Sequence, residues 1–156
     1  MLLPWFQWIE SLWLGKFIVG SNWMFPVIES VHLLGLALLG GSVVIVDMRL
    51  FGILFTSRPV SEIAREARPW MTRGIIVMLA TGIPLFMSEA VKCYYSAAFW
   101  VKMYALVAAL IYTYTIRTRV TQAEAVQSTA RQVLVGALSI AVWFTVAAGG
   151  RWIGFS

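Results

Sequence analysis

Long runs of apolar residues, separated by short polar stretches, make up most of the chain. Four of these runs, at about 25–46, 74–90, 99–116 and 133–150, contain few charged residues. A helix needs about 20 mostly apolar residues to cross the roughly 30 Å of hydrocarbon in a bilayer. The pattern therefore predicts an all-α fold, an integral membrane four-helix bundle that forms a single domain over 1–156.

The first 20 residues are also apolar, but their pattern differs. A fifth span would bury Glu10 at mid-membrane, at a cost of roughly 2.5–3.5 kcal/mol. Trp5, Trp8 and Leu12 recur at helical spacing, and tryptophan favours the headgroup level. We therefore expect 1–20 to form an amphipathic helix that lies in the membrane interface and does not span.

Composition excludes a soluble domain. The 156 residues are 60% hydrophobic and 12% charged, whereas soluble domains carry about 25% charged residues. The net charge of +5 comes from basic residues that are spread along the chain and form no stripe, so a nucleic acid is not an expected partner. The chain has one cysteine and one histidine, which excludes sites that need two of either from one chain.

The basic residues also predict the orientation in the membrane. The links after the first and third spans, with the span ends beside them, carry eight arginines: Arg49, Arg58, Arg65, Arg68, Arg73, Arg117, Arg119 and Arg131. The opposite side carries four basic residues: Lys16, Lys92, Lys102 and Arg151. Because cytoplasmic loops are enriched in Lys and Arg, both termini are expected outside, which in a bacterial inner membrane is the periplasm.

His32 is the main candidate for chemistry. It follows Pro26 by six residues and so lies about 9 Å below the outer end of the first span, where an ionisable residue is a candidate functional group. Glu29, on the same helical face, could hold one imidazole nitrogen while the other faces a ligand. Gly35 leaves room for a second backbone or for a flat macrocycle, and its spacing does not distinguish the two. A Glu–His pair that only ties two helices together is the alternative.

The predicted topology collects further polar residues near His32. We call the predicted set the outer layer, and it comprises Glu29, His32, Glu89, Lys92, Lys102 and Arg151. Its cations could bind the carboxylates of an amphipathic ligand such as haem. Taken one at a time, they are more typical of lysines and arginines that snorkel to the interface. Met87, Cys93 and Met103 fall at the same height and, with His32, would suit Cu(I).

At the inner end, Asp47 and Arg49 are two residues apart and cannot face each other on a helix. Each therefore needs a partner from another part of the chain. We interpret this pair as a structural clamp at the cytoplasmic interface.

Several motifs resemble an uncharacterised family of small bacterial four-helix membrane proteins, a domain of unknown function. The motifs are Glu29-Ser30-Val31-His32-Leu33-Leu34-Gly35, Asp47-Met48-Arg49-Leu50-Phe51-Gly52, Thr81-Gly82, Ser88-Glu89-Ala90 with Lys92, and Gly150-Arg151-Trp152-Ile153-Gly154-Phe155. The likeness extends from Phe25 to the end of the chain. It implies the fold and the topology but no activity.

A more distant resemblance rests on a histidine early in one helix and a lysine in a later aromatic-rich helix. In this pattern the chain is similar to the small membrane-bound protoporphyrinogen oxidases that bind haem b, and to the membrane helices of copper-resistance D proteins. The resemblance implies that His32 ligates haem iron and that Lys102 matches the lysine of the third helix. Those proteins have further histidines, so here the iron would be five-coordinate, take Met87, or be shared between subunits.

The leading hypothesis is a haem b-binding protein of membrane electron transfer, with His32 as axial ligand, Glu29 orienting the imidazole, and Lys92, Lys102 and Arg151 meeting propionates. Expected partners are the lipid bilayer, a quinone or porphyrin, and either a redox partner or a second copy in a homo-oligomer. Two alternatives stay open. One is copper binding or transport, and the other is a structural or assembly subunit without a cofactor.

Overall fold

The computed structural model describes residues 2–123 and 129–154. Its helices in chain order are α1 (Leu3–Ser11), α2 (Trp13–Val19), α3 (Met24–Leu50), α4 (Val60–Ser88), α5 (Ala90–Tyr95), α6 (Ala97–Tyr112), the π-helical turn η1 (Thr113–Arg117), α7 (Thr118–Gln122) and α8 (Thr129–Ile153). Within these ranges every regular element is a helix. The predicted all-α class is confirmed.

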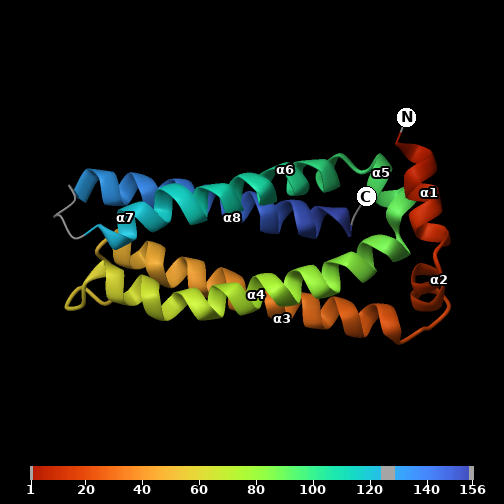
Figure 1. Cartoon of the computed structure of the whole chain (residues 1–156), viewed down its shortest axis with the longest axis horizontal. Coiled ribbons are helices and arrows are strands. Elements are labelled where there is room, and N and C mark those ends of the chain that lie inside the picture. The colour runs from red at the N-terminus through yellow and green to blue at the C-terminus, as the bar shows by residue number, and fades with distance from the viewer. Residues whose placement is uncertain (1, 124–128, 155–156) are drawn as a thin grey trace.

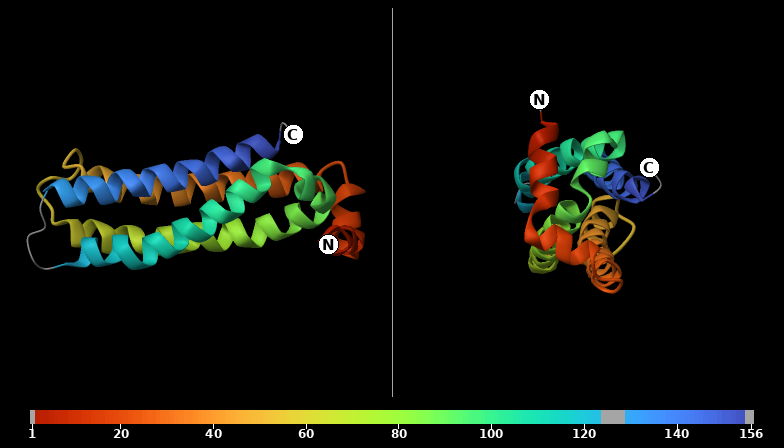
Figure 2. Two further views of the ribbon diagram at one scale, coloured as in Figure 1. Left: turned by 90° about the horizontal axis from the view of Figure 1, so that it is seen from above. Right: turned by 90° about the vertical axis from the view of Figure 1, so that its right-hand side faces the viewer.

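Four long helical segments run side by side along the length of the molecule (Figure 1). Each is long and apolar enough to cross a membrane: Met24–Leu50, Val60–Ser88, Ala97–Gln122 and Thr129–Ile153. The N-terminus and the C-terminus lie at the same end of this bundle, as four spans require (Figures 1 and 2). We call this end the α1 end and the opposite one the α7 end.

The helices α1 and α2 lie across the α1 end rather than along the bundle (Figures 1 and 2). Glu10 accepts a hydrogen bond from the backbone N–H of Val91 at 2.7 Å, so its carboxylate satisfies one of the free N–H groups that begin α5. Phe6 packs edge-on against Phe86 and Tyr94. The N-terminal segment is therefore bound to the bundle by both polar and aromatic contacts, and it forms two short helices where we expected one.

The second long helix begins earlier than expected. The sequence suggested a polar link at 56–73, yet α4 begins at Val60 and continues through Ser88. Val60, Ile63, Ala67 and Met71 recur at helical spacing, so the polar stretch has an apolar face that packs on the bundle. The transmembrane helix thus extends beyond the apolar core as an amphipathic helix.

Glycines allow α3 and α4 to pack closely. A Cβ on Gly35 would come within 2.7 Å of Val77 Cγ1, and one on Gly74 would come within 2.9 Å of the backbone nitrogen of Leu39. Both distances are shorter than ordinary van der Waals contact. The α3–α4 pair is therefore held by contacts that tolerate no side chain at these two positions, as is common between membrane helices.

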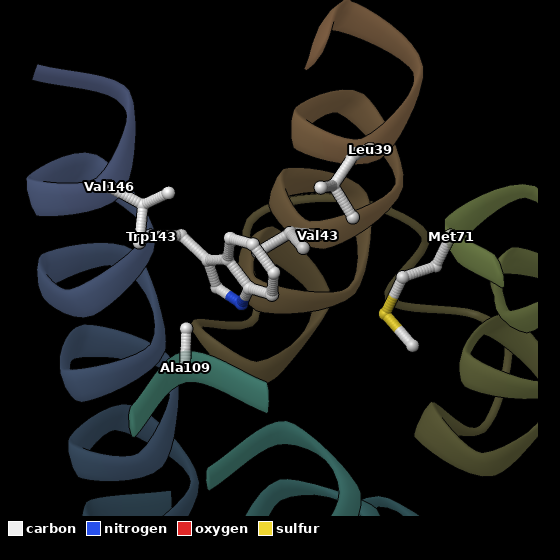
Figure 3. Packing of buried hydrophobic residues seen from close by; sticks show 6 residues of the cluster. All are labelled: Leu39, Val43, Met71, Ala109, Trp143 and Val146. Carbon is white, nitrogen blue, oxygen red and sulfur yellow. The ribbon is translucent and has the colours of Figure 1, made fainter. Parts of the chain in front are cut away.

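The other long helices close the core in the middle of the bundle. Trp143 of α8 points toward Val43 of α3, with Leu39, Met71, Ala109 and Val146 around them (Figure 3). The Trp143 indole N–H donates to Thr113 Oγ1 at 3.1 Å, which satisfies its polar group in the core. This contact ties α8 to the first residue of η1.

Candidate functional site

The imidazole of His32 is held by a threonine on the neighbouring helix. His32 Nδ1 lies 2.7 Å from Thr81 Oγ1, and the Thr81 hydroxyl donates to the Val77 carbonyl at 2.6 Å. A hydroxyl has one proton, so Thr81 Oγ1 accepts from the Nδ1–H of the imidazole. The proton therefore sits on Nδ1, and Nε2 presents a free lone pair.

This contact corrects the role expected for Glu29. Glu29 lies one turn before His32 on α3 and is exposed, whereas the imidazole's partner comes from α4. The side chain one turn away on the same helix was the natural sequence-based choice. The bond instead crosses between helices, because α3 and α4 pack closely enough for a short threonine to reach the ring.

Two glycines near His32 have different surroundings. A Cβ on Gly82 would lie 3.2 Å from His32 Cε1, so the missing side chain makes room for the imidazole itself. The space beside Gly35 is occupied by Val77. Gly35 therefore serves close helix packing in this structure, and the room for a flat ligand has to come from another side of His32.

Lys102 brings a positive charge to the same region. It lies on α6, close enough to His32 for an electrostatic interaction. A Cβ on Gly149 would meet Lys102 Cβ at 3.1 Å, and one on Gly150 would lie 3.5 Å from Lys102 Nζ, so the side chain runs along the glycine pair of α8. No carboxylate among the described residues pairs with its ammonium group. The structure thus brings His32, Thr81, Gly82 and Lys102 together from three helices.

The remaining residues of the outer layer lie at the α1 end but are less closely gathered. Glu89 and Lys92 form an exposed ion pair with each other at 3.8 Å. Arg151 is exposed near the end of α8. Their placement at one end follows from the topology.

The proposed soft-metal ligands other than His32 come from three different helices. Met87 follows Thr81 by six residues, about 9 Å along α4. Cys93 is buried in α5, and burial raises the pKa of its thiol to about 11, which disfavours the thiolate that binds metal. Met103 is 38% exposed on α6. No group of three His, Cys, Asp or Glu residues in the described ranges could hold a metal ion.

A second polar cluster lies deep in the bundle toward the α7 end. Asp47 Oδ1 accepts from Arg117 Nε at 2.9 Å, and Arg117 Nη2 donates to the Val43 carbonyl at 2.9 Å. Asp47 is fully buried and Arg117 is 5% exposed. The partner that Asp47 needed is therefore an arginine on η1, 70 residues away in sequence.

Arg49, the other half of the expected clamp, makes a local contact instead. Its Nε donates to the carbonyl of Arg58 at 2.8 Å, which fastens the turn between α3 and α4. In the sequence, Arg117 stood out only as a topology signal. A basic residue at the apolar end of a span was the available clue, because a buried carboxylate normally needs a cation.

Comparison with known proteins adds a family. The model of DUF6644, a family of unknown function, matches residues 5–156. Searches of curated proteins and of solved structures gave no match.

Proposed function

We propose that this chain, which belongs to DUF6644, binds haem b through His32 and works in membrane electron transfer. The family has no assigned activity, so the proposal rests on the site itself. The protein is a multi-pass membrane protein. We further propose that it lies in a bacterial inner membrane with both termini periplasmic, which places His32 near the periplasmic face. Support for this orientation is the excess of arginines near the α7 end.

The observation that carries the proposal is the contact between His32 Nδ1 and Thr81 Oγ1, whose hydroxyl donates to the Val77 carbonyl. Iron-ligating histidines commonly donate their second ring N–H to a hydrogen-bond acceptor, which orients the ring and increases its basicity. Thr81 supplies that acceptor here, and Nε2 is left as the ligating nitrogen. A histidine that only tied helices together would gain nothing from a free Nε2 in the apolar interior.

The surrounding residues fit a haem in two further respects. The ammonium group of Lys102, without a carboxylate partner among the described residues, suits a propionate. Gly82 lets the imidazole pack closely against α4, which helps to hold the ring in place. When bound, haem supplies one-electron chemistry, while His32 holds the iron and Thr81 keeps the imidazole oriented. A second copy of the chain would provide a second histidine, and a quinone or porphyrin is the proposed reaction partner.

The test is the absorption spectrum of the purified protein together with a pyridine haemochrome assay. Wild type should contain haem, and His32→Ala should lose it, because no second histidine can replace the ligand. Thr81→Val should retain haem with a shifted reduction potential, since only the partner of Nδ1 is removed. Glu29→Gln is the matched control and should leave both haem content and potential unchanged.

Two results would overturn this proposal. A colourless wild type that contains copper, lost in His32→Ala, would favour the copper function. A wild type free of haem and copper after expression with added haem would favour the structural or assembly role.

A further inference from the structure

A cleft at the α7 end has a chemistry that the His32 site does not use. It has a volume of about 580 Å³ and lies between the beginning of α4 and α7. Three arginines line it: Arg65 and Arg68 from α4, and Arg117 from η1. Its size is in the range of small-molecule sites.

The acidic residue that lines the cleft is paired with an arginine that does not line it. Glu62 lines the cleft, but its carboxylate accepts a hydrogen bond from Arg58 Nη2 at 2.6 Å. Arg58 also pairs with Glu66, outside the cleft lining. Among the described residues no carboxylate within ion-pair distance pairs with Arg65 or Arg68. Arg65 interacts electrostatically with Glu62 but forms no ion pair with it, so both arginines keep N–H groups for an anion.

Arg117 is fixed in position before any ligand arrives. Its Nε and Nη2 are bound to Asp47 and to the Val43 carbonyl, while Nη1 has no hydrogen-bond partner in the described part of the chain. The side chain is 5% exposed, so its position is set by the core. A guanidinium held in this way loses little conformational freedom when it binds an anion.

The cleft lies at the height of lipid headgroups. Trp70 is 51% exposed on α4, with the guanidinium of Arg73 4.8 Å from its ring, a pairing typical of the membrane–water interface. Arg68 and Arg65 precede Trp70 by about 3 Å and about 7 Å along the helix. The headgroup layer extends roughly 5–8 Å beyond the hydrocarbon on each side. With Trp70 at the hydrocarbon edge, Arg68 lies within that layer and Arg65 lies at its outer boundary.

From these observations we propose that the cleft binds the phosphate group of an anionic lipid, with Arg65, Arg68 and Arg117 as its donors. Basic pockets between transmembrane helices are suited to such headgroups. Arginine presents paired N–H groups to phosphate oxygens, which lysine does not. The lipid is the favoured source of the phosphate because the cleft opens in the layer where lipid phosphates are concentrated.

The experiment measures thermal unfolding of the full chain in neutral detergent with added lipid. Phosphatidylglycerol should raise the melting temperature of wild type, and phosphatidylcholine should not. In a titration, the Arg65→Gln/Arg68→Gln double variant should bind phosphatidylglycerol more weakly, on the order of fivefold for each arginine removed. Arg119→Gln, an exposed arginine at the same end that does not line the cleft, is the matched control and should behave as wild type.

A third arm separates the sources of phosphate. Inorganic phosphate at the same concentration should give no shift at matched ionic strength. The proposal is overturned if the double variant binds phosphatidylglycerol as tightly as wild type, if Arg119→Gln loses as much affinity as the double variant, or if inorganic phosphate reproduces the lipid effect.

Discussion

Two ionisable side chains inside the bundle, the half-buried His32 and the fully buried Asp47, have different surroundings. His32 donates to a neutral hydroxyl and keeps one nitrogen free. Asp47 faces a full positive charge, and its second oxygen Oδ2 has no hydrogen-bond partner among the described residues. A neutral imidazole with a free lone pair is suited to a ligand, whereas an ion pair inside the core is suited to holding helices in one arrangement.

The Asp47–Arg117 pair should show strong coupling between its members. Arg117→Ala leaves a buried carboxylate without a cation and should destabilise the protein by about 3–5 kcal/mol. Asp47→Ala should have a similar effect, and the double variant should be much less destabilised than the sum. Unfolding free energies of the three variants in mixed detergent measure this. Simple additivity would mean that the two charges do not stabilise each other.

Cys93 gives a pH-dependent prediction. An ordinary thiol, with a pKa near 9.0, is half ionised at that pH, but burial raises the pKa of Cys93 to about 11. Since the thiolate is the reactive form, alkylation of the folded protein should stay slow at pH 9 and become fast after denaturation. Mass spectrometry of samples taken over time follows the reaction. Rapid labelling of folded protein at pH 8 would place this thiol in solvent.

At the scale of elements, the α3–α4 pair depends on glycine. Gly35→Ala would bring a methyl group within 2.7 Å of Val77 Cγ1, and overpacking of this kind costs about 1–3 kcal/mol. Gly41→Ala is the matched control on the same helix, because a Cβ there meets nothing within 4 Å. Thermal unfolding should show a lower melting temperature for the first variant and no loss for the second. Equal behaviour would argue against close packing at Gly35.

The long helices could be predicted because apolar runs of this length have few alternatives in a bilayer. Helix ends were less predictable, since α4 continues for about four turns beyond its apolar part through an amphipathic segment. Glu10 indicated that the N-terminal segment does not span, but its bond to Val91 could not be foreseen from sequence. Contacts between residues far apart in sequence depend on how helices rotate against each other, which periodicity alone does not fix.

The candidate site followed the same rule. His32 and Lys102 stood out because each is an ionisable residue inside an apolar run, which is visible in the sequence alone. Thr81 and Arg117 did not, because a threonine is ordinary in a membrane helix and the arginine was explained by topology. The roles of both residues became clear only from the contacts that they make with α3 in the structure.

At the scale of the whole molecule, the orientation can be tested with reporter fusions. A fusion after Ser61, at the α7 end, should report cytoplasm, and one after Ser96, at the α1 end, should report periplasm. The reason is the concentration of arginines near the α7 end. The reverse pattern would place His32 near the cytoplasmic face and would contradict the proposed orientation.

The exposed tryptophans also determine which bilayer the molecule fits. Trp8, Trp23 and Trp152 are exposed at the α1 end, and Trp70 is exposed toward the α7 end. From Trp70 to the end of α4 at Ser88 is about 27 Å of helix. That length is slightly below the roughly 30 Å of an average hydrocarbon core. A thicker membrane therefore creates a hydrophobic mismatch, which the protein relieves by thinning the lipid around it or by associating with other copies.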